Sequence, residues 1–239
     1  MFVFLFLKSQ DTTSLNEDLC PTDGEISRVL VLFDTSDGLG LVTSLDIKKR
    51  LIELSNNVEI HSRFEFSTLN PSYPIRNVLF NACNAPKGEE VDSTIENPKL
   101  AQKKWEEGFF EPLNKLFLNL PETQANQSPI MAGIQDIALN YLGTSDSSSV
   151  RTEIIIISDM IEHTDSYSQY HGNLSFNRYV DSKGYKKFAT NLNGADVYIW
   201  LVIRENSTIN TLKHMNFWTE WIRDNRGQLK KVNKLQGVN

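Results

Sequence analysis

Cysteine is scarce in this chain: of 239 residues, only Cys20 and Cys83 carry a thiol group. No Cys-x-x-Cys pair is present, so a structural zinc site is not expected. Two cysteines allow either one disulfide or two separate buried thiols, and the choice depends on whether the compartment is oxidising. The residues themselves leave both alternatives open.

The N-terminal apolar run is too short to span a bilayer. Phe2–Leu7 is strongly apolar but has six residues, whereas a transmembrane helix needs about 20. No basic region precedes it, as one would in a signal peptide. An edge strand, a docked tail and the stub of a membrane segment are the three alternatives. The residues that follow are polar and include Pro21 and Gly24, so we divide the chain into an N-terminal stub and linker, 1–27, and one domain, 28–239.

The common nucleotide and hydrolase signatures are also missing. There is no Gly-x-x-x-x-Gly-Lys loop and no Gly-x-Ser-x-Gly turn, and the segment Gly38-Leu39-Gly40 lacks the third glycine of a dinucleotide loop. The formal net charge is −6 and the pI is about 5.3, which argues against a nucleic-acid partner.

What the chain does contain is a regular alternation of strand and helix patterns. With 40% hydrophobic and 23% charged residues, a folded globular domain is expected. The alternation predicts an α/β fold with a doubly wound, mostly parallel central sheet flanked by helices. Strands are expected at 29–33, 58–66, 78–80, 154–157, 195–203 and 228–235. Helices are expected at 41–55, 183–192 and 212–222, and Gly227 is expected to end the last of these. Two more are expected to begin with proline: one from Pro98, with a kink or break at Pro112, and one from Pro129, with Ser128 as its N-cap. A long loop is expected at 162–178.

Two aspartates follow predicted buried strands. Asp34 comes directly after Val29–Phe33, with Ser36 two residues later, and Asp159 follows the run Ile154–Ile157 closely. The carboxyl ends of parallel strands meet at one edge of a sheet, where ligands collect. Carboxylate and hydroxyl oxygens are hard ligands that suit Mg²⁺, Mn²⁺ or Ca²⁺. Capping of the following segment is the alternative role for Asp34.

This arrangement resembles the metal-ion-dependent adhesion site of von Willebrand factor type A domains. That family places Asp-x-Ser-x-Ser after its first strand, and here Asp34 and Ser36 match while Gly38 stands at the second serine. Ser128 resembles the hydroxyl that a later loop supplies, and Asp159 resembles the last carboxylate. The resemblance therefore implies a partly degenerate site in which these four residues hold Mg²⁺, or Mn²⁺ or Ca²⁺.

A closer resemblance covers nearly the whole chain and is to a group of uncharacterised bacterial von Willebrand A-like proteins. It implies an N-terminal membrane segment, of which Phe2–Leu7 would be the remnant, and hence a domain in the periplasm anchored to the inner membrane; a cytoplasmic location is the alternative. It also makes a disulfide between Cys20 and Cys83 credible. The motifs that carry it are Leu19-Cys20-Pro21, Asp34–Leu39, Cys83-Asn84, Asn97-Pro98, Lys103–Trp105, Phe109–Leu113, Ser128–Ile130, Ser158–Met160 and Phe217-Trp218.

The resemblance favours a non-enzymatic module that docks another protein at the carboxyl edge of the sheet, through an open coordination position on the metal. Four nearby residues are candidates for partner contact, each with a plainer alternative. Asp37 fits equally into a turn, and His163 can be an ordinary surface histidine. Tyr167 and Tyr170 either line the contact or pin their loop to the domain.

Two other functions use the same residues. A metal-dependent hydrolase or phosphotransfer enzyme would employ Asp34 and Asp159, with His163 as base; a haloacid-dehalogenase mechanism is disfavoured because Ser36 stands where the second acid is needed. In the other, a metal-free scaffold, the metal site would be decayed, and Gly38 in place of the second serine would reflect that decay.

Overall fold

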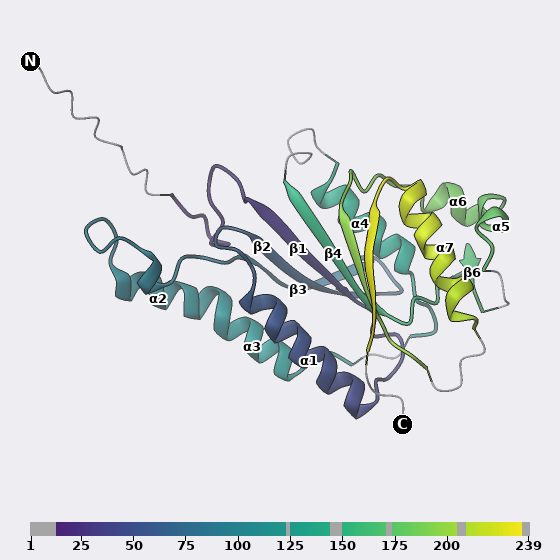
Figure 1. Cartoon of the computed structure of the whole chain (residues 1–239), viewed down its shortest axis with the longest axis horizontal. Coiled ribbons are helices and arrows are strands. Elements are labelled where there is room, and N and C mark those ends of the chain that lie inside the picture. Colours follow the sequence, from purple (N-terminus) through teal and green to yellow (C-terminus); the bar gives the residue numbers. More distant parts are fainter. Residues whose placement is uncertain (1–12, 123–124, 144–149, 171–173, 205–208, 236–239) are drawn as a thin grey trace, which may run out of the picture.

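The computed structural model describes residues 13–122, 125–143, 150–170, 174–204 and 209–235. Its centre is a six-stranded sheet in the order β3-β2-β1-β4-β7-β8 (Figure 1). Only β3 runs antiparallel to its neighbour; the other pairs are parallel. The predicted doubly wound α/β fold is therefore confirmed. The strands are β1 (Ser27–Phe33), β2 (Arg63–Leu69), β3 (Arg76–Cys83), β4 (Arg151–Ser158), β7 (Asp196–Leu201) and β8 (Gln228–Lys234).

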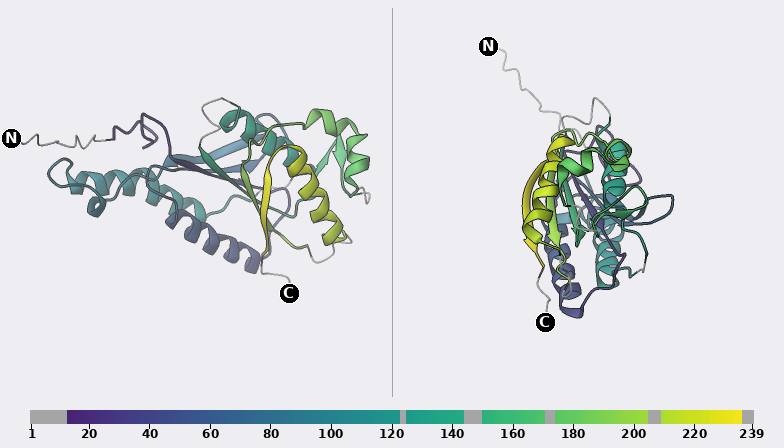
Figure 2. Two further views of the ribbon diagram at one scale, coloured as in Figure 1. Left: turned by 45° about the horizontal axis from the view of Figure 1, so that its top comes forward. Right: turned by 90° about the vertical axis from the view of Figure 1, so that its right-hand side faces the viewer.

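Helices cover both faces of this sheet (Figures 1 and 2). Because side chains alternate along a strand, Leu30 and Leu32 of β1 pack on one face and Val31 and Phe33 on the other. The first face is covered by α4 and α7, and the second by α1 and α3. The helices are α1 (Leu41–Asn56), α2 (Pro98–Trp105), α3 (Glu111–Leu118), α4 (Ile130–Tyr141), α5 (Phe176–Val180), α6 (Lys183–Lys187) and α7 (Thr211–Asp224), together with the short 3₁₀ turn η1 (Gly88–Glu90).

The break expected near Pro112 takes the form of a π-helical segment. η2 (Glu106–Phe110) joins α2 to α3, and Pro112 lies in the first turn of α3, where its missing N–H does no harm. The three segments form one continuous helical rod that extends past the end of α1 (Figure 1).

Several predicted elements needed correction. The strand expected at 58–66 begins only at Arg63, and the helix expected at 183–192 ends at Lys187. The segment 162–178 is not a plain loop, since it contains the hairpin β5 (His163–Thr164) and β6 (Tyr167–Ser168) and the start of α5.

Gly227 does not end the last helix. α7 stops at Asp224, and Arg226 takes the left-handed backbone conformation, with φ of 61°. A Cβ at position 227 would lie 2.6 Å from Leu192 Cδ1, so close packing explains the glycine there.

The N-terminal segment is fastened to the domain. Cys20 and Cys83 form a disulfide, which resolves the alternatives that the sequence left open. Cys20 is buried, and Leu19 packs against the backbone of Gly108 in η2. Phe2–Leu7 lies outside the described residues. Among the residues that the structure describes, no helix combines the length and the apolar character needed to cross a membrane.

Candidate metal and partner-binding site

Asp34 lies at the centre of a hydrogen-bonded cluster at the carboxyl edge of the sheet. Its backbone N–H continues the ladder by donating to Ile157 O at 2.9 Å. Oδ1 accepts from the backbone N–H of Ser36 at 3.0 Å, while Oδ2 accepts from Ser128 Oγ at 2.7 Å and from Ser158 Oγ at 2.8 Å. The residue is 5% exposed. Asp34 therefore caps its own turn and also collects hydroxyl groups from two distant segments.

Of the two positions expected for Ser128, the N-cap of α4 and a place beside Asp34, the structure shows the second. α4 begins at Ile130 with Pro129 at the N-cap position, so Ser128 is not the N-cap. Its backbone instead exchanges two hydrogen bonds with His163, each of 3.0 Å, and this pairing aims the hydroxyl at Asp34. A second tie holds the same region, since the N–H of Ala125 donates to Ser36 O at 3.0 Å.

Asp159 forms the other half of the site. Oδ1 accepts from the N–H of Ile161 at 2.9 Å, and Oδ2 accepts from Arg204 Nε at 3.0 Å. Burial raises the pKa of the Asp159 carboxyl, and the negative charge of Asp34 raises it further, while Arg204 opposes the shift. The two acids are thus close enough to influence each other, because β1 and β4, the strands that they follow, are neighbours in the sheet.

Arg204 is a residue of the site that the sequence analysis missed. Besides Asp159, it contacts Gly38 O through Nη1 at 2.7 Å and Asp37 Oδ2 through Nη2 at 3.7 Å. It follows β7, whose carboxyl end lies at the same sheet edge beside β4. That position in the topology is the signal that could have identified it.

The backbone after Asp159 is locked to α7. Met160 has φ of 63°, and its carbonyl oxygen accepts from Trp218 Nε1 at 2.8 Å. His214 Nε2 lies 2.8 Å from the same oxygen, and burial lowers the His214 pKa to about 4. Trp218 and Trp221 are fully buried in the core.

The four candidate partner-contact residues differ in their exposure. Asp37 and Tyr170 are exposed beside the site, at 52% and 54%. His163 is half-buried, with Nδ1 2.9 Å from Ser168 Oγ and its ring edge-on to Tyr170. Tyr167 is buried and stacks on Phe217, so it pins the hairpin to its own domain, the second of the two roles considered for it.

A buried acid that the sequence analysis did not single out lies behind the site. Glu162 Oε2 accepts from the N–H of Met131 in the first turn of α4, at 2.8 Å. Burial raises the pKa of Glu162 to about 8, and the charge of Asp34 adds to the rise. The raised pKa favours the protonated form of Glu162, which reduces the negative charge that this acid adds behind the site.

The donor set suits a hard cation. Two buried carboxylates and the hydroxyl groups of Ser36 and Ser128 offer oxygen ligands alone. A Cβ at Gly38 would meet no atom within 4 Å, so the missing serine leaves open space that water can occupy. In the described ranges, the three-residue group with metal-ligand spacing is Cys20, Glu25 and Cys83, whose sulfurs are joined in the disulfide.

The sheet topology defines the class: the fold is a doubly wound α/β domain, an architecture shared by von Willebrand A-like and Rossmann-like domains. No protein-family model matches the chain, and no curated protein matches it. Among solved structures, it is similar to an aerotolerance-related membrane protein from Bacteroides fragilis, with 11% identity, TM-score 0.40, and coverage of 88% of this chain and 92% of that one. It is also similar to the manganese-loaded TRAP protein of Plasmodium vivax, with 13% identity, TM-score 0.37, and coverage of 81% of this chain and 62% of that one.

Proposed function

We propose that this domain is a non-enzymatic protein-interaction module whose contact site is a divalent cation held at the carboxyl edge of the sheet. The observation that carries the proposal is the short contact between Ser128 Oγ and Asp34 Oδ2, 2.7 Å, across a separation of 94 residues. It brings the two halves of the predicted motif into one cluster, beside Asp159.

The residues that would hold the ion are Asp34, Ser36, Ser128 and Asp159. The cation would offer a coordination position to an acidic group of the partner. Ser128 and Ser158 hold Asp34 in place by donating to Oδ2, while the oxygens of the two serines keep lone pairs for further contacts. Exposed Asp37 and Tyr170 border the site and would contact the partner, with His163 supporting the Tyr170 ring.

Metal titration of thermal stability tests the cation. Mg²⁺, Mn²⁺ or Ca²⁺ at about 100 times its Kd would stabilise the native state by about 2.7 kcal/mol, or roughly 5 to 10 °C in Tm for a chain of this size. Asp34→Ala and Asp159→Ala should abolish the shift, while Asp181→Ala, at an exposed aspartate between α5 and α6, should retain it. A wild-type protein whose Tm responds to none of the three ions would disprove the metal site.

Partner capture tests the module. Wild-type protein immobilised in Mg²⁺ should retain a partner from a host extract that EDTA releases, and Asp34→Ala should retain none. Equal capture by both proteins, with or without EDTA, would support a metal-free scaffold instead.

A further inference from the structure

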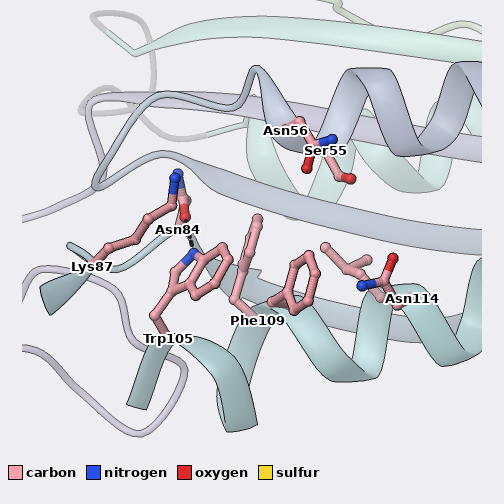
Figure 3. Close-up of a pocket in the computed structure, with 9 residues that line it drawn as sticks. Ser55, Asn56, Asn84, Lys87, Trp105, Phe109 and Asn114 are labelled. Atoms are coloured by element: carbon pink, nitrogen blue, oxygen red, sulfur yellow. Dashed lines mark hydrogen bonds between the residues drawn. The ribbon is translucent and has the colours of Figure 1, made fainter. Parts of the chain in front are cut away.

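A cavity lies at the opposite edge of the sheet from Asp34. It has a volume of about 140 Å³ and opens between the C-terminal end of α1 and the α2–η2–α3 rod (Figure 3). α1 starts beyond the carboxyl end of β1 and runs back along the sheet, so its last residues, Ser55 and Asn56, reach the amino edge. The lining residues used below are Ser55, Asn56, Lys87, Trp105, Phe110 and Asn114.

The π-helical segment creates the aromatic wall of this cavity. In an α-helix, residues five apart are rotated by about 140° and cannot stack. In η2 the N–H of Glu111 bonds to Glu106 O, five residues back, so the turn is widened. Trp105 and Phe110 consequently stack, with ring centroids 4.8 Å apart and an angle of 22° between the planes. π-segments are rare and occur frequently at functional sites.

Core packing accounts for only part of this stack, in which Trp105 packs partly buried against the core. Phe109 is the η2 aromatic that enters the core, at 3% exposed, where it meets Phe64 and Phe80 edge-on. Phe110 points outward and is 39% exposed. The widened turn therefore presents an aromatic surface to the cavity in addition to filling the core.

Hydrogen bonds hold the wall in position. Trp105 Nε1 donates to Asn84 Oδ1 at 2.9 Å, and the Asn84 amide donates to Val58 O at 2.8 Å. Lys87 Nζ lies 5.1 Å from the centre of the Trp105 ring. The wall is thus preorganised, which lowers the entropic cost of binding.

We propose that this cavity binds a single pyranose ring of a carbohydrate. The C–H groups of a pyranose pack against an aromatic face such as that of Phe110. The amides of Asn56 and Asn114 can each donate and accept, as the hydroxyl groups of a sugar require. The Ser55 hydroxyl donates to Ile52 O at 3.0 Å and keeps its lone pairs to accept from a sugar hydroxyl. The volume is below the range of about 300–1,000 Å³ for drug-sized ligands, and so suits one ring.

The residues that line the cavity disfavour a glycosidase. The C-terminal end of α1 carries partial negative charge, which attracts hydroxyl donors, and Lys87 adds a positive charge to the lining. No carboxylate is among the described residues that line the cavity, whereas glycoside hydrolysis uses a pair. The site therefore binds a sugar without cleaving it.

Ligand-observed NMR tests the proposal with glucose, galactose, mannose, N-acetylglucosamine and glucuronic acid, and with adenosine as a ligand that has an aromatic base but no pyranose ring. At least one sugar should show saturable saturation transfer with a Kd of about 1 mM. The same sugar should change the fluorescence of Trp105, since Trp200, Trp218 and Trp221 are buried. Trp105→Phe should abolish the fluorescence response.

Two variants locate the binding. Phe110→Ala and Asn114→Ala should each weaken it about tenfold, whereas Leu100→Ala, at a 49% exposed position on α2 outside the cavity, should not. Asp34→Ala should bind the sugar as the wild type does, which separates this site from the metal site. The proposal is overturned if none of the five sugars binds, if adenosine alone binds, or if Phe110→Ala and Leu100→Ala behave alike.

Discussion

Arg204 donates a hydrogen bond from Nε to Asp159 Oδ2, with 3.0 Å between the two atoms. The guanidinium thereby places a fixed positive charge at the edge of a site that two buried carboxylates make negative. A divalent cation bound to Asp159 would compete with Arg204 for the negative charge of this carboxylate and for its Oδ2 atom.

Removal of this guanidinium should strengthen metal binding. We expect Arg204→Ala to lower the Kd for Mn²⁺ about tenfold, because a competing cation near Asp159 is lost. This factor is the effect of a change in charge interaction large enough to shift a carboxyl pKa by about one unit. Isothermal titration calorimetry measures the change, with Arg223→Ala, an exposed arginine in the last turn of α7, as the matched control. Weaker metal binding by Arg204→Ala would show that Arg204 supports the site instead of competing for it.

Glu162 should make the stability of the protein fall as pH rises. Its pKa is about 8 in the folded state against an ordinary value of 4.5. Between these two values the unfolded chain has lost a proton that the folded chain retains. The free energy of unfolding should therefore decrease with pH across this window, by up to about 1.4 kcal/mol per pH unit from this group.

Glu162→Gln isolates that contribution, because glutamine stays neutral and keeps an oxygen for the N–H of Met131. Urea unfolding at pH 5 and pH 8 should show that the variant gains stability relative to the wild type as pH rises. Glu89→Gln, at an exposed glutamate, should follow the wild type at both pH values. Parallel curves for Glu162→Gln and the wild type would mean that Glu162 titrates normally.

The disulfide should contribute strongly to stability. It joins residues 63 positions apart, and the loop-closure model assigns such a loop about 4 kcal/mol. Cys20→Ser/Cys83→Ser should lose about this much free energy of unfolding in urea. A reducing agent should destabilise the wild type and leave the double variant unchanged; equal stability of both proteins would show that the N-terminal segment contributes little.

A buried ion pair at β2 and β3 should be costly to break. Arg76 is 6% exposed and pairs with Glu65, which is 1% exposed, and its Nε lies 2.6 Å from Asp136 Oδ2. Arg76→Met should destabilise the protein by about 3–5 kcal/mol, since it leaves Glu65 buried without its cation. Arg151→Met, which removes an exposed pair with Glu153, should cost at most about 1 kcal/mol in the same urea experiment.

The sequence predicted the sheet well because burial leaves a clear local pattern. The run Ile154–Ile157 is apolar without alternation, and it forms the centre of β4 with both faces covered. Strand ends were harder to place. The alternating segment 58–66 suggested a strand, yet pairing with β1 begins only at Arg63. Pairing depends on the neighbouring strand, which the local pattern does not contain.

The site was predicted in part for a related reason. Asp34 and Asp159 were found because each lies close to the end of an apolar run. Ser158 was not singled out, although its hydroxyl donates to Asp34 Oδ2 from 124 residues away. Arg204 follows a strand as well, but its bond to Asp159 depends on how the loops fold over the sheet edge.

By itself, the sequence determined that the chain alternates strands and helices and that Asp34 and Asp159 each follow a buried strand, because hydrophobic periodicity and chain connectivity are local properties. The tertiary structure alone decided that Ser128 serves Asp34 rather than α4, that Arg204 neutralises Asp159, and that a widened helical turn stacks Trp105 on Phe110. These relationships are contacts between segments that packing brings together. A hydrogen bond forms only over a short distance, and the folded chain alone sets the distances between such segments.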